Sequence, residues 1–331
     1  MLWILFIICT ALIVYSGYRL SQYGDILAEK TGLGRTWVGL VIMASVTSLP
    51  ELITGISAVT YAHVPDIAAG GVLGSCVFNI LILALLDAMY PPMPISSKAG
   101  QGHILSAGFG ILLLGIVGGS LLLGRGLPGL GWVGLYSLLI VGIYLLAERI
   151  IYFYEKKQIS DFVKDRAIEL RYETVSTRSA VLNYSFHAAI VIAAAVFLPE
   201  IGKGIAESSG LGETFVGNIF IAFSTSLPEV VVSIAALRID AIDLAIGNLF
   251  GSNIFNILIL AIDDMFFLKG PLLSFVDMNH LVPVIAAITM TAIAIIGLTY
   301  RSGKKKLFLA WDSLAIVLVY VFTLVVLYVK R

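Results

Sequence analysis

Two glutamates, Glu51 and Glu229, each end the motif Thr-Ser-Leu-Pro-Glu in well-separated parts of the chain. The motif lies within Ala44–Val59 and again within Ala222–Leu237, and both stretches are mostly apolar. An ionisable side chain at the centre of a membrane helix costs roughly 2.5–3.5 kcal/mol on insertion scales. A chain that carries this cost twice predicts two carboxylates that face an internal cavity and a cation. We expect both to serve one site.

Oxygen-bearing residues accompany each glutamate at helical spacing. Pro50 and Pro228 lack the N–H that a helix needs, so we expect discontinuous helices with freed backbone carbonyls. Hydroxyl groups three or four residues before each glutamate would share its helix face. The next apolar segment of each half adds a serine and an asparagine four residues apart. These side chains are Thr47, Ser48, Ser75, Asn79, Thr225, Ser226, Ser252 and Asn256.

This ligand set favours a hard cation. Ca²⁺ takes about 6–8 oxygen ligands, whereas zinc or copper would require histidine or cysteine. The four histidines lie outside the cluster, and Cys9 and Cys76 are lone cysteines in apolar segments. We therefore expect no cofactor, no redox chemistry and no transition-metal transport.

Each feature alone has a structural explanation. A proline in a membrane helix is often a kink, and a serine or asparagine there is usually a contact between helices. The joint occurrence of all these features in both halves favours a binding site. Asp87, Asp263 and Asp264 leave two interpretations open: they line an ion path, or they lie near helix ends and reach water.

Composition identifies an integral membrane protein. Of 331 residues, 59% are hydrophobic and only 13% are charged, against roughly 25% charged in soluble proteins. The fold class predicted is all-α, with ten transmembrane helices. The apolar windows lie near 1–18, 36–61, 66–89, 103–123, 130–153, 181–200, 213–237, 243–265, 280–299 and 307–329.

The basic residues predict the topology. With the N-terminus outside, 16 of the 21 lysines and arginines fall in cytoplasmic connections, so a multi-pass cell-membrane protein with both termini outside is favoured. The first span has no basic n-region and no small-residue cleavage site, so we expect a retained anchor and not a signal peptide. Lys304, Lys305 and Lys306 are most simply a positive-inside anchor, which could also contact anionic lipid headgroups.

The chain consists of two similar halves. An offset of 178 residues aligns Gly24–Val59 with Gly202–Leu237, with roughly half of the positions identical. An offset of 177 then matches GSCVFNILILAL, from Gly74, to GSNIFNILILAI, from Gly251. Each half holds five spans, an odd number, so we expect inverted-topology repeats over residues 1–153 and 181–331. Residues 154–180 form a polar cytoplasmic linker in this scheme.

With TSLPE twice, followed by GSCVFN and GSNIFN, the sequence resembles the Ca²⁺/cation antiporter superfamily, and most of all its prokaryotic sodium/calcium exchangers. The resemblance covers nearly the whole chain. It implies a secondary active antiporter, not an enzyme, that exchanges Na⁺ for Ca²⁺ by alternating access at a shared site. By motif position it implies the ion ligands Glu51, Glu229, Thr47, Ser48, Thr225, Ser226, Ser75, Asn79, Ser252 and Asn256, with backbone oxygens of Ala44 and Ala222.

Two departures from the family pattern widen the alternatives. Val46 and Ser224 stand where the family usually has glycine, and Asn256 stands where close prokaryotic relatives often have aspartate. Mg²⁺ as substrate, or protons as counter-ion, therefore remain alternatives. A cation channel is less favoured because inverted repeats suit rocking about one site. An intramembrane hydrolase lacks a Ser/His or metal-binding pair. Zero net charge gives no argument for nucleic acid, and a monomer is compatible with the sequence.

Overall fold

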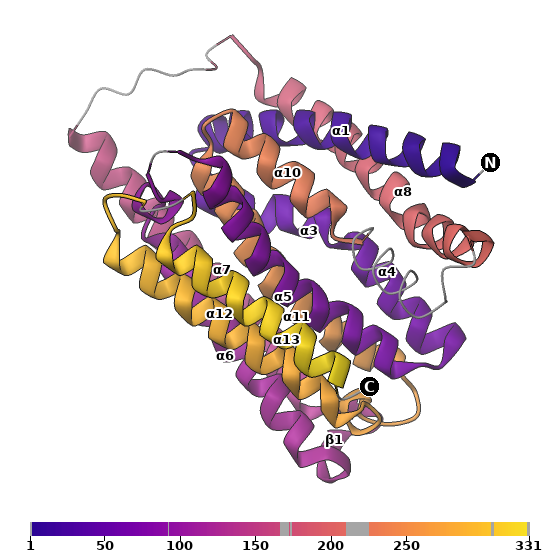
Figure 1. Ribbon diagram of the computed structural model, residues 1–331. Coiled ribbons are helices and arrows are strands. Elements are labelled where there is room, and N and C mark those ends of the chain that lie inside the picture. Colours follow the sequence, from indigo (N-terminus) through magenta and orange to yellow (C-terminus); the bar gives the residue numbers. More distant parts are fainter. Residues whose placement is uncertain are drawn as a thin grey trace. The chain divides into compact units, whose positions relative to one another are not determined.

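A computed structural model of the chain describes residues 2–91, 93–165, 172, 174–209, 225–305 and 308–329. Apart from one short hairpin, its regular elements are helical (Figure 1). The α-helices are α1 (Leu2–Thr31), α2 (Arg35–Trp37), α3 (Ala44–Thr47), α4 (Leu49–Ser57), α5 (Pro65–Met89), α6 (Gly102–Leu123), α7 (Leu135–Asp165), α8 (Thr177–Ser209), α10 (Leu227–Arg238), α11 (Ile242–Phe266), α12 (Leu281–Tyr300) and α13 (Trp311–Val329).

Shorter elements join these helices. Two π-helices, η1 (Val38–Met43) and η2 (Ala58–Ala62), continue α2 and α4. The 3₁₀ turns are η3 (Ile95–Ser97), η4 (Gly124–Gly126), η5 (Leu272–Ser274) and η6 (Met278–His280). Strands β1 (Gly129–Leu130) and β2 (Val133–Gly134) form an antiparallel hairpin that pairs Leu130 with Val133.

Nine helical segments among the described residues are long and apolar enough to cross a membrane. They coincide with nine of the ten predicted windows, so the predicted all-helical membrane fold is confirmed. The remaining window, 213–237, is described only from Thr225 onward, and α10 is the part seen. Helices α1 and α8 extend well beyond their windows, and many of their large apolar side chains are exposed, as lipid-facing surfaces require.

The two sequence halves fold alike. Helices α5 and α11 both have 25 residues, and their bounds are related by the 177-residue offset of the sequence alignment. The same offset relates the 3₁₀ turns η3 and η5 that follow them. The internal repeat read from the sequence is therefore also a repeat of structure.

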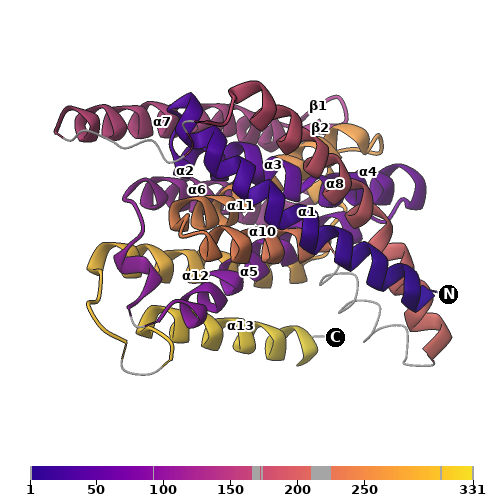
Figure 2. The same ribbon diagram turned by 90° about the horizontal axis from the view of Figure 1, so that it is seen from above.

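The chain divides into two compact units, and each takes residues from both sequence halves. The first unit comprises residues 1–50 and 152–248, in which α1 packs along α8 and α10 (Figures 1 and 2). One close approach of its helices is between Gly39 and Gly247. A Cβ at Gly39 would lie 2.5 Å from the carbonyl oxygen of Leu244, and one at Gly247 would lie 2.7 Å from that of Thr36. Small residues here allow the close approach that membrane helices use to pack.

The second unit comprises residues 51–151 and 249–331. In this unit α12 packs against α6, α13 and α5, and α13 runs beside α12 in both views (Figures 1 and 2). The predicted linker lies outside this unit and is not wholly irregular, because α7 continues to Asp165 before α8 begins at Thr177.

Connections in the second unit meet in two groups. Arg301 donates to the carbonyl oxygen of Ala99 over 2.8 Å, which joins the α5–α6 connection to the α12–α13 connection. Trp132 donates to the carbonyl oxygen of Met265 over 3.0 Å, which joins the β-hairpin to the end of α11. The predicted topology assigns the first pair of connections to the cytoplasm and the second pair to the outside, so the loops that meet are those expected on the same side.

Candidate functional site

The first TSLPE motif interrupts its helix at Ser48, and the equivalent Ser226 of the second motif directly precedes α10. Ser48 separates α3 from α4 with φ −93° and ψ 4°, and Ser226 precedes α10 with φ −88° and ψ 4°. Both residues leave helical geometry just before a Leu-Pro pair, as the missing proline N–H requires. The predicted discontinuity is confirmed at Ser48. The interruption brings a hydroxyl group to each helix break and the glutamate into the first turn beyond it.

The first unit brings Ser48 to Glu229. The Ser48 hydroxyl donates to Oε1 of Glu229 over 3.2 Å, although the two residues are 181 positions apart. Both side chains are buried, with Ser48 fully inaccessible and Glu229 only 1% exposed. A buried carboxylate beside a hydroxyl oxygen offers two of the oxygen types that hard cations bind.

Thr47 occupies the same part of the first unit. Its hydroxyl lies 3.3 Å from Oδ1 of Asn248 and 3.2 Å from the carbonyl oxygen of Ala44. Asn248 in turn donates to Ser233 over 3.1 Å. The side chain of Asn248 therefore holds the hydroxyl of Thr47 between the broken helix and α10.

The second unit brings Ser75 to Glu51 and Asn79 to Asn253. Ser75 donates to Oε1 of Glu51 over 3.4 Å, and the Asn79 amide donates to Oδ1 of Asn253 over 3.0 Å. Asn253 also donates to the carbonyl oxygen of Cys76 over 3.1 Å. Cys76 and Asn253 are equivalent positions of the repeat, so the two related helices touch at one shared level.

Two amides of the second unit have unsatisfied atoms. Oδ1 of Asn79 and both polar side-chain atoms of Asn256 have no hydrogen-bond partner among the described residues, and both side chains are fully buried. Leaving such a group unsatisfied costs about 1–3 kcal/mol. A cation that accepts lone pairs from the two amide oxygens would remove much of this cost.

The other predicted ligands are buried or lie outside the described residues. Thr225 is 7% exposed, Ser226 is 1% exposed, and Ser252 and Ala44 are fully buried. Ala222 and Ser224 fall outside the described residues. The described ligands divide between the units: Ala44, Thr47, Ser48, Thr225, Ser226 and Glu229 in the first, and Glu51, Ser75, Asn79, Ser252 and Asn256 in the second.

Sequence reasoning missed Asn248, Ser233 and Asn253, which position predicted ligands. A signal for the two asparagines was present, because they stand in α11 where the aligned positions of α5 hold Gly71 and Cys76. A polar residue that the repeat does not require at a buried position needs its own explanation.

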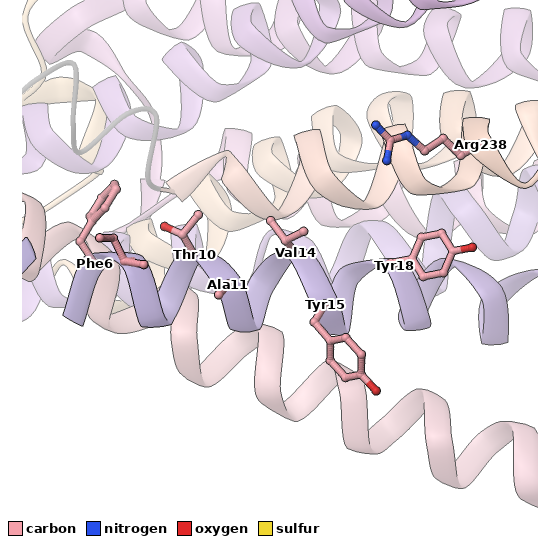
Figure 3. A pocket seen from close by; sticks show the side chains of 8 residues that line it. Phe6, Thr10, Ala11, Val14, Tyr15, Tyr18 and Arg238 are labelled. Atoms are coloured by element: carbon pink, nitrogen blue, oxygen red, sulfur yellow. The ribbon is translucent and has the colours of Figure 1, made fainter. Parts of the chain in front are cut away.

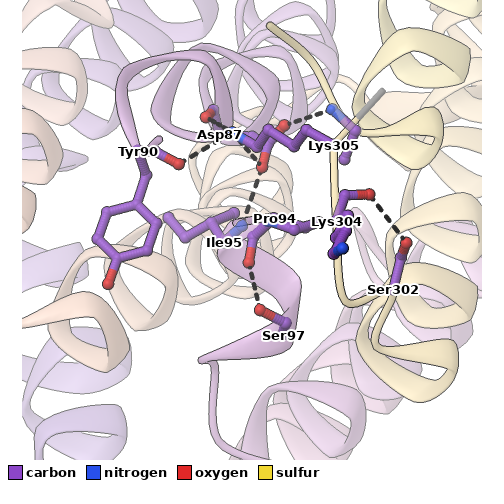
Figure 4. Close-up of polar contacts among 9 residues, drawn as sticks. Asp87, Tyr90, Pro94, Ile95, Ser97, Ser302, Lys304 and Lys305 are labelled. Atoms are coloured by element: carbon purple, nitrogen blue, oxygen red, sulfur yellow. Dashed lines mark hydrogen bonds and ion pairs between the residues drawn. The ribbon is translucent and has the colours of Figure 1, made fainter. Parts of the chain in front are cut away.

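Asp87 and Asp264 are helix-end anchors. Asp87 accepts from the backbone N–H of Ile95, at 2.9 Å, and it pairs with Lys305 (Figure 4). It also accepts from the backbone N–H of Ala310, at 2.8 Å. Lys305 also donates to the carbonyl oxygens of Asp87 and Tyr90. The simple interpretation of Lys305 as an anchor at the membrane surface is therefore incomplete, since its side chain is only 5% exposed and is neutralised by Asp87.

Asp264 performs the equivalent task at the end of α11. It accepts from the Leu272 N–H, eight residues onward as in Asp87 to Ile95, and from the N–H of Gly134. The hydroxyls of Tyr136 and Ser137 complete its shell at 2.7 and 2.6 Å. Neither Asp87 nor Asp264 reaches water, because both are fully buried, and both use their oxygens to fix loops.

A surface hollow of the first unit lies away from the predicted ion ligands. A groove of about 620 Å³ runs along the exposed face of α1, from Phe6 to Tyr18, with Arg238 at one end (Figure 3). None of the predicted ion ligands lines it. Within the described part of the chain no three His, Cys, Asp or Glu side chains gather as they do in many metal sites.

Comparison with known proteins decides the family. The family model described as sodium/calcium exchanger protein matches residues 1–152 and 179–329, which is most of the chain. The chain belongs to the sodium/calcium exchanger protein family. The chain is 30% identical over 258 residues to inner membrane protein YrbG of Escherichia coli (strain K12), and the match covers 77% of this chain and 76% of YrbG.

A functionally named relative and a solved structure agree with this assignment. The sodium/calcium exchanger MaX1 of Methanosarcina acetivorans is 26% identical over 333 residues and covers 91% of both chains. A structure of the sodium-calcium exchanger NCX_Mj superposes with a TM-score of 0.73 at 22% identity and covers 98% of this chain and 99% of that one. This structural likeness shows that the family member has the NCX_Mj fold.

Proposed function

We propose that this chain is a secondary active antiporter that exchanges Na⁺ for Ca²⁺ across the membrane. The observation that carries the proposal is the repeated TSLPE motif, in which a buried glutamate follows a Thr-Ser pair in each half and lies in the first turn of α4 or α10. A symmetric pair of buried carboxylates has no comparably simple structural role in a membrane. Membership in the sodium/calcium exchanger family and the sequence likeness to MaX1 support the same activity.

The ion ligands of the proposal are those predicted from the motifs. Glu51 and Glu229 supply the charge, and hydroxyl and amide oxygens complete the coordination. Two carboxylates neutralise one Ca²⁺, whereas three Na⁺ would leave a net charge of +1. The hydroxyl contacts of Ser48 with Glu229 and of Ser75 with Glu51 support the assignment, since each hydroxyl oxygen is held beside a carboxylate. The buried, unsatisfied amides of Asn79 and Asn256 support it further.

We place both termini outside the cell. The proposal rests on the 16 of 21 basic residues that this orientation assigns to the cytoplasm. Single cysteines can test it in a background without Cys9 and Cys76. In intact cells a membrane-impermeant maleimide should label Lys269→Cys and spare Lys304→Cys, and the reverse pattern would invert the topology.

The decisive experiment for the activity is flux in proteoliposomes. Vesicles loaded with Na⁺ and diluted into Na⁺-free medium with tracer Ca²⁺ should accumulate Ca²⁺, and an ionophore that collapses the Na⁺ gradient should stop the uptake. Parallel vesicles with K⁺ or H⁺ gradients test the alternative counter-ions, and Mg²⁺ competition tests the alternative substrate. Ca²⁺ entry at equal rate without any gradient would favour a channel.

The chain acts in this proposal as a transporter and not as an enzyme, in the lipid bilayer and without a cofactor. A monomer contains both copies of the repeat and needs no partner subunit to complete its ligand set. Cross-linking in native membranes measures the oligomeric state directly.

A further inference from the structure

Asp263 is a buried acid that the ligand set leaves unexplained. It lies in α11 and is completely inaccessible to solvent. Neither carboxylate oxygen has a hydrogen-bond partner among the described residues. Its neighbour Asp264 accepts four hydrogen bonds. Two adjacent aspartates therefore differ completely in how their charge is accommodated.

The fold does not require an acid at this position. The equivalent residue of α5 is Leu86, which is also fully buried. An ionised carboxylate in a dry interior without donor or counter-ion costs several kcal/mol. The group can persist there only when a cation, either a proton or a metal ion, compensates it. A leucine would avoid this cost, so packing alone does not explain the acid.

The position of Asp263 relates it to the ion ligands. It follows Asn256 by seven residues, two helical turns, and so returns to the same face of α11 about 10 Å further along the axis. Its carboxylate lies against Gly55 of α4, where any Cβ would overlap both oxygens. Gly55 is one turn beyond Glu51. The glycine thus leaves space for the acid between the two helices that carry Glu51 and Asn256.

We propose that Asp263 is a cation-binding station on the ion path, between the ion ligands and the C-terminal end of α11. A transported hard cation, Na⁺ or Ca²⁺, is bound there briefly as it enters or leaves. The inference rests on the proposed exchange activity, and the proposed topology places this end of α11 outside the cell. A charged group beside a low-dielectric path raises the local cation concentration and the association rate by about 10–10³-fold.

If Asp263 binds cations on the ion path, its removal should raise the KM for Ca²⁺ on one side of the membrane only. In Asp263→Asn the KM for Ca²⁺ presented at the C-terminal end of α11 should rise about tenfold or more. The maximal rate and the KM at the opposite face should stay within about twofold, because the association step alone is affected. Right-side-out and inside-out membrane vesicles from the same cells give the two KM values.

Two further variants keep the test specific. Asp263→Ser is smaller than aspartate, fits beside Gly55 and should reproduce the one-sided increase in KM. Asp66→Asn removes an acid that is 46% exposed and that lies in the first turn of α5, near the end expected outside. It makes the same chemical change, and its KM should remain within about twofold of wild type on both sides.

Two outcomes would contradict the proposed cation-binding role of Asp263. Asparagine is isosteric with a protonated aspartic acid, so a permanently protonated, purely structural Asp263 would give wild-type KM values on both sides. Equal increases on both sides, with weaker equilibrium Ca²⁺ binding in calorimetry, would also overturn it by indicating damage to the ion ligands. Failure of the exchange proposal is distinguishable, because the wild-type vesicles themselves would then show no Na⁺-driven uptake.

Discussion

Helices α5 and α11 are copies of one element, and they differ in a way that separates scaffold from function. Each carries the Ser-Cys/Asn-x-x-Asn run and ends in an aspartate that binds the backbone N–H eight residues onward. Only α11 adds buried polar residues, where α5 has Gly71, Cys76 and Leu86. Asn248 and Asn253 each satisfy two neighbours, whereas Asp263 satisfies none of the described residues.

The comparison shows that the two halves share helix bounds and backbone contacts more closely than they share the side chains that make those contacts. Asp87 and Asp264 do the same work with different partners, a buried lysine in one case and two hydroxyls in the other. A donor shell of either kind satisfies a carboxylate, so the sequence can drift around a fixed structural role. An acid without a donor shell cannot be explained in this way.

We expect the largest effect on transport from the buried glutamate that both halves carry. Glu51→Gln and Glu229→Gln should each reduce Na⁺-driven Ca²⁺ uptake on the order of 100-fold, because each removes half of the charge that neutralises a hard dication. Unfolding temperatures should not fall, since a costly buried charge is removed. Flux in proteoliposomes and thermal unfolding in detergent measure the two effects.

The matched control for these two variants is Glu200→Gln, which makes the same change at an exposed position of α8. It should transport as wild type. If only one of the two buried glutamates proves essential, the halves do not contribute equally, and the symmetric ligand assignment is wrong.

The next largest effect is on stability, and it should distinguish the helix-end aspartate Asp87 from its equivalent Asp264. Asp87→Asn should destabilise the protein by about 3–5 kcal/mol, because it leaves Lys305 buried without its counter-charge. Adding Lys305→Met should recover a large part of that loss. Chemical unfolding of the two single variants and the double variant gives the coupling energy.

A zero coupling energy would mean that Lys305 does not pair with Asp87. Asp264→Asn provides the comparison, since among the described residues this anchor is held by backbone N–H and hydroxyl donors, and no charge change in a partner should rescue it. Its loss should be spread over backbone and hydroxyl donors.

A smaller effect tests the scaffold that α11 adds. Asn253→Cys makes α11 resemble α5 and removes the partners of the Asn79 amide and the Cys76 carbonyl. The two lost bonds should cost about 1–3 kcal/mol together, and the displaced Asn79 should weaken Ca²⁺ binding. Calorimetry and thermal unfolding measure both, with Cys76→Ala as the control for a change of shape at the same contact. Unchanged binding in Asn253→Cys would show that Asn79 needs no such support.

The smallest effect is expected at Ser233. Ser233→Ala removes the acceptor of the Asn248 amide and should cost about 0.5–1.5 kcal/mol, with the exchange rate within about twofold of wild type. If Ser233→Ala lost as much transport as Glu229→Gln, the role of Ser233 as a support for Asn248 would be wrong, because Ser233 would then contact the ion itself. Flux and unfolding of the one variant suffice.

The sequence alone determined the helical membrane fold, the repeat and the helix break at Ser48. Apolar windows of membrane length leave few alternatives to a helix, because every backbone polar group must be satisfied within lipid. Pro50 and Pro228 fix where the helices break, since proline removes one donor at a known position. The 177-residue offset of the sequence alignment also relates the first and last residues of α5 to those of α11.

Only the tertiary structure decided what each buried acid does. Asp87, Asp263 and Asp264 look alike in sequence, but only Asp87 and Asp264 meet donors among the described residues, and one donor to Asp87 lies 223 positions away. Such partners are set by helix packing, which residue types and spacing do not specify. The same holds for Asn248 and Asn253, whose contacts join segments from both halves of the chain. Local pattern fixes which residues are polar and buried, and packing fixes which of them are satisfied.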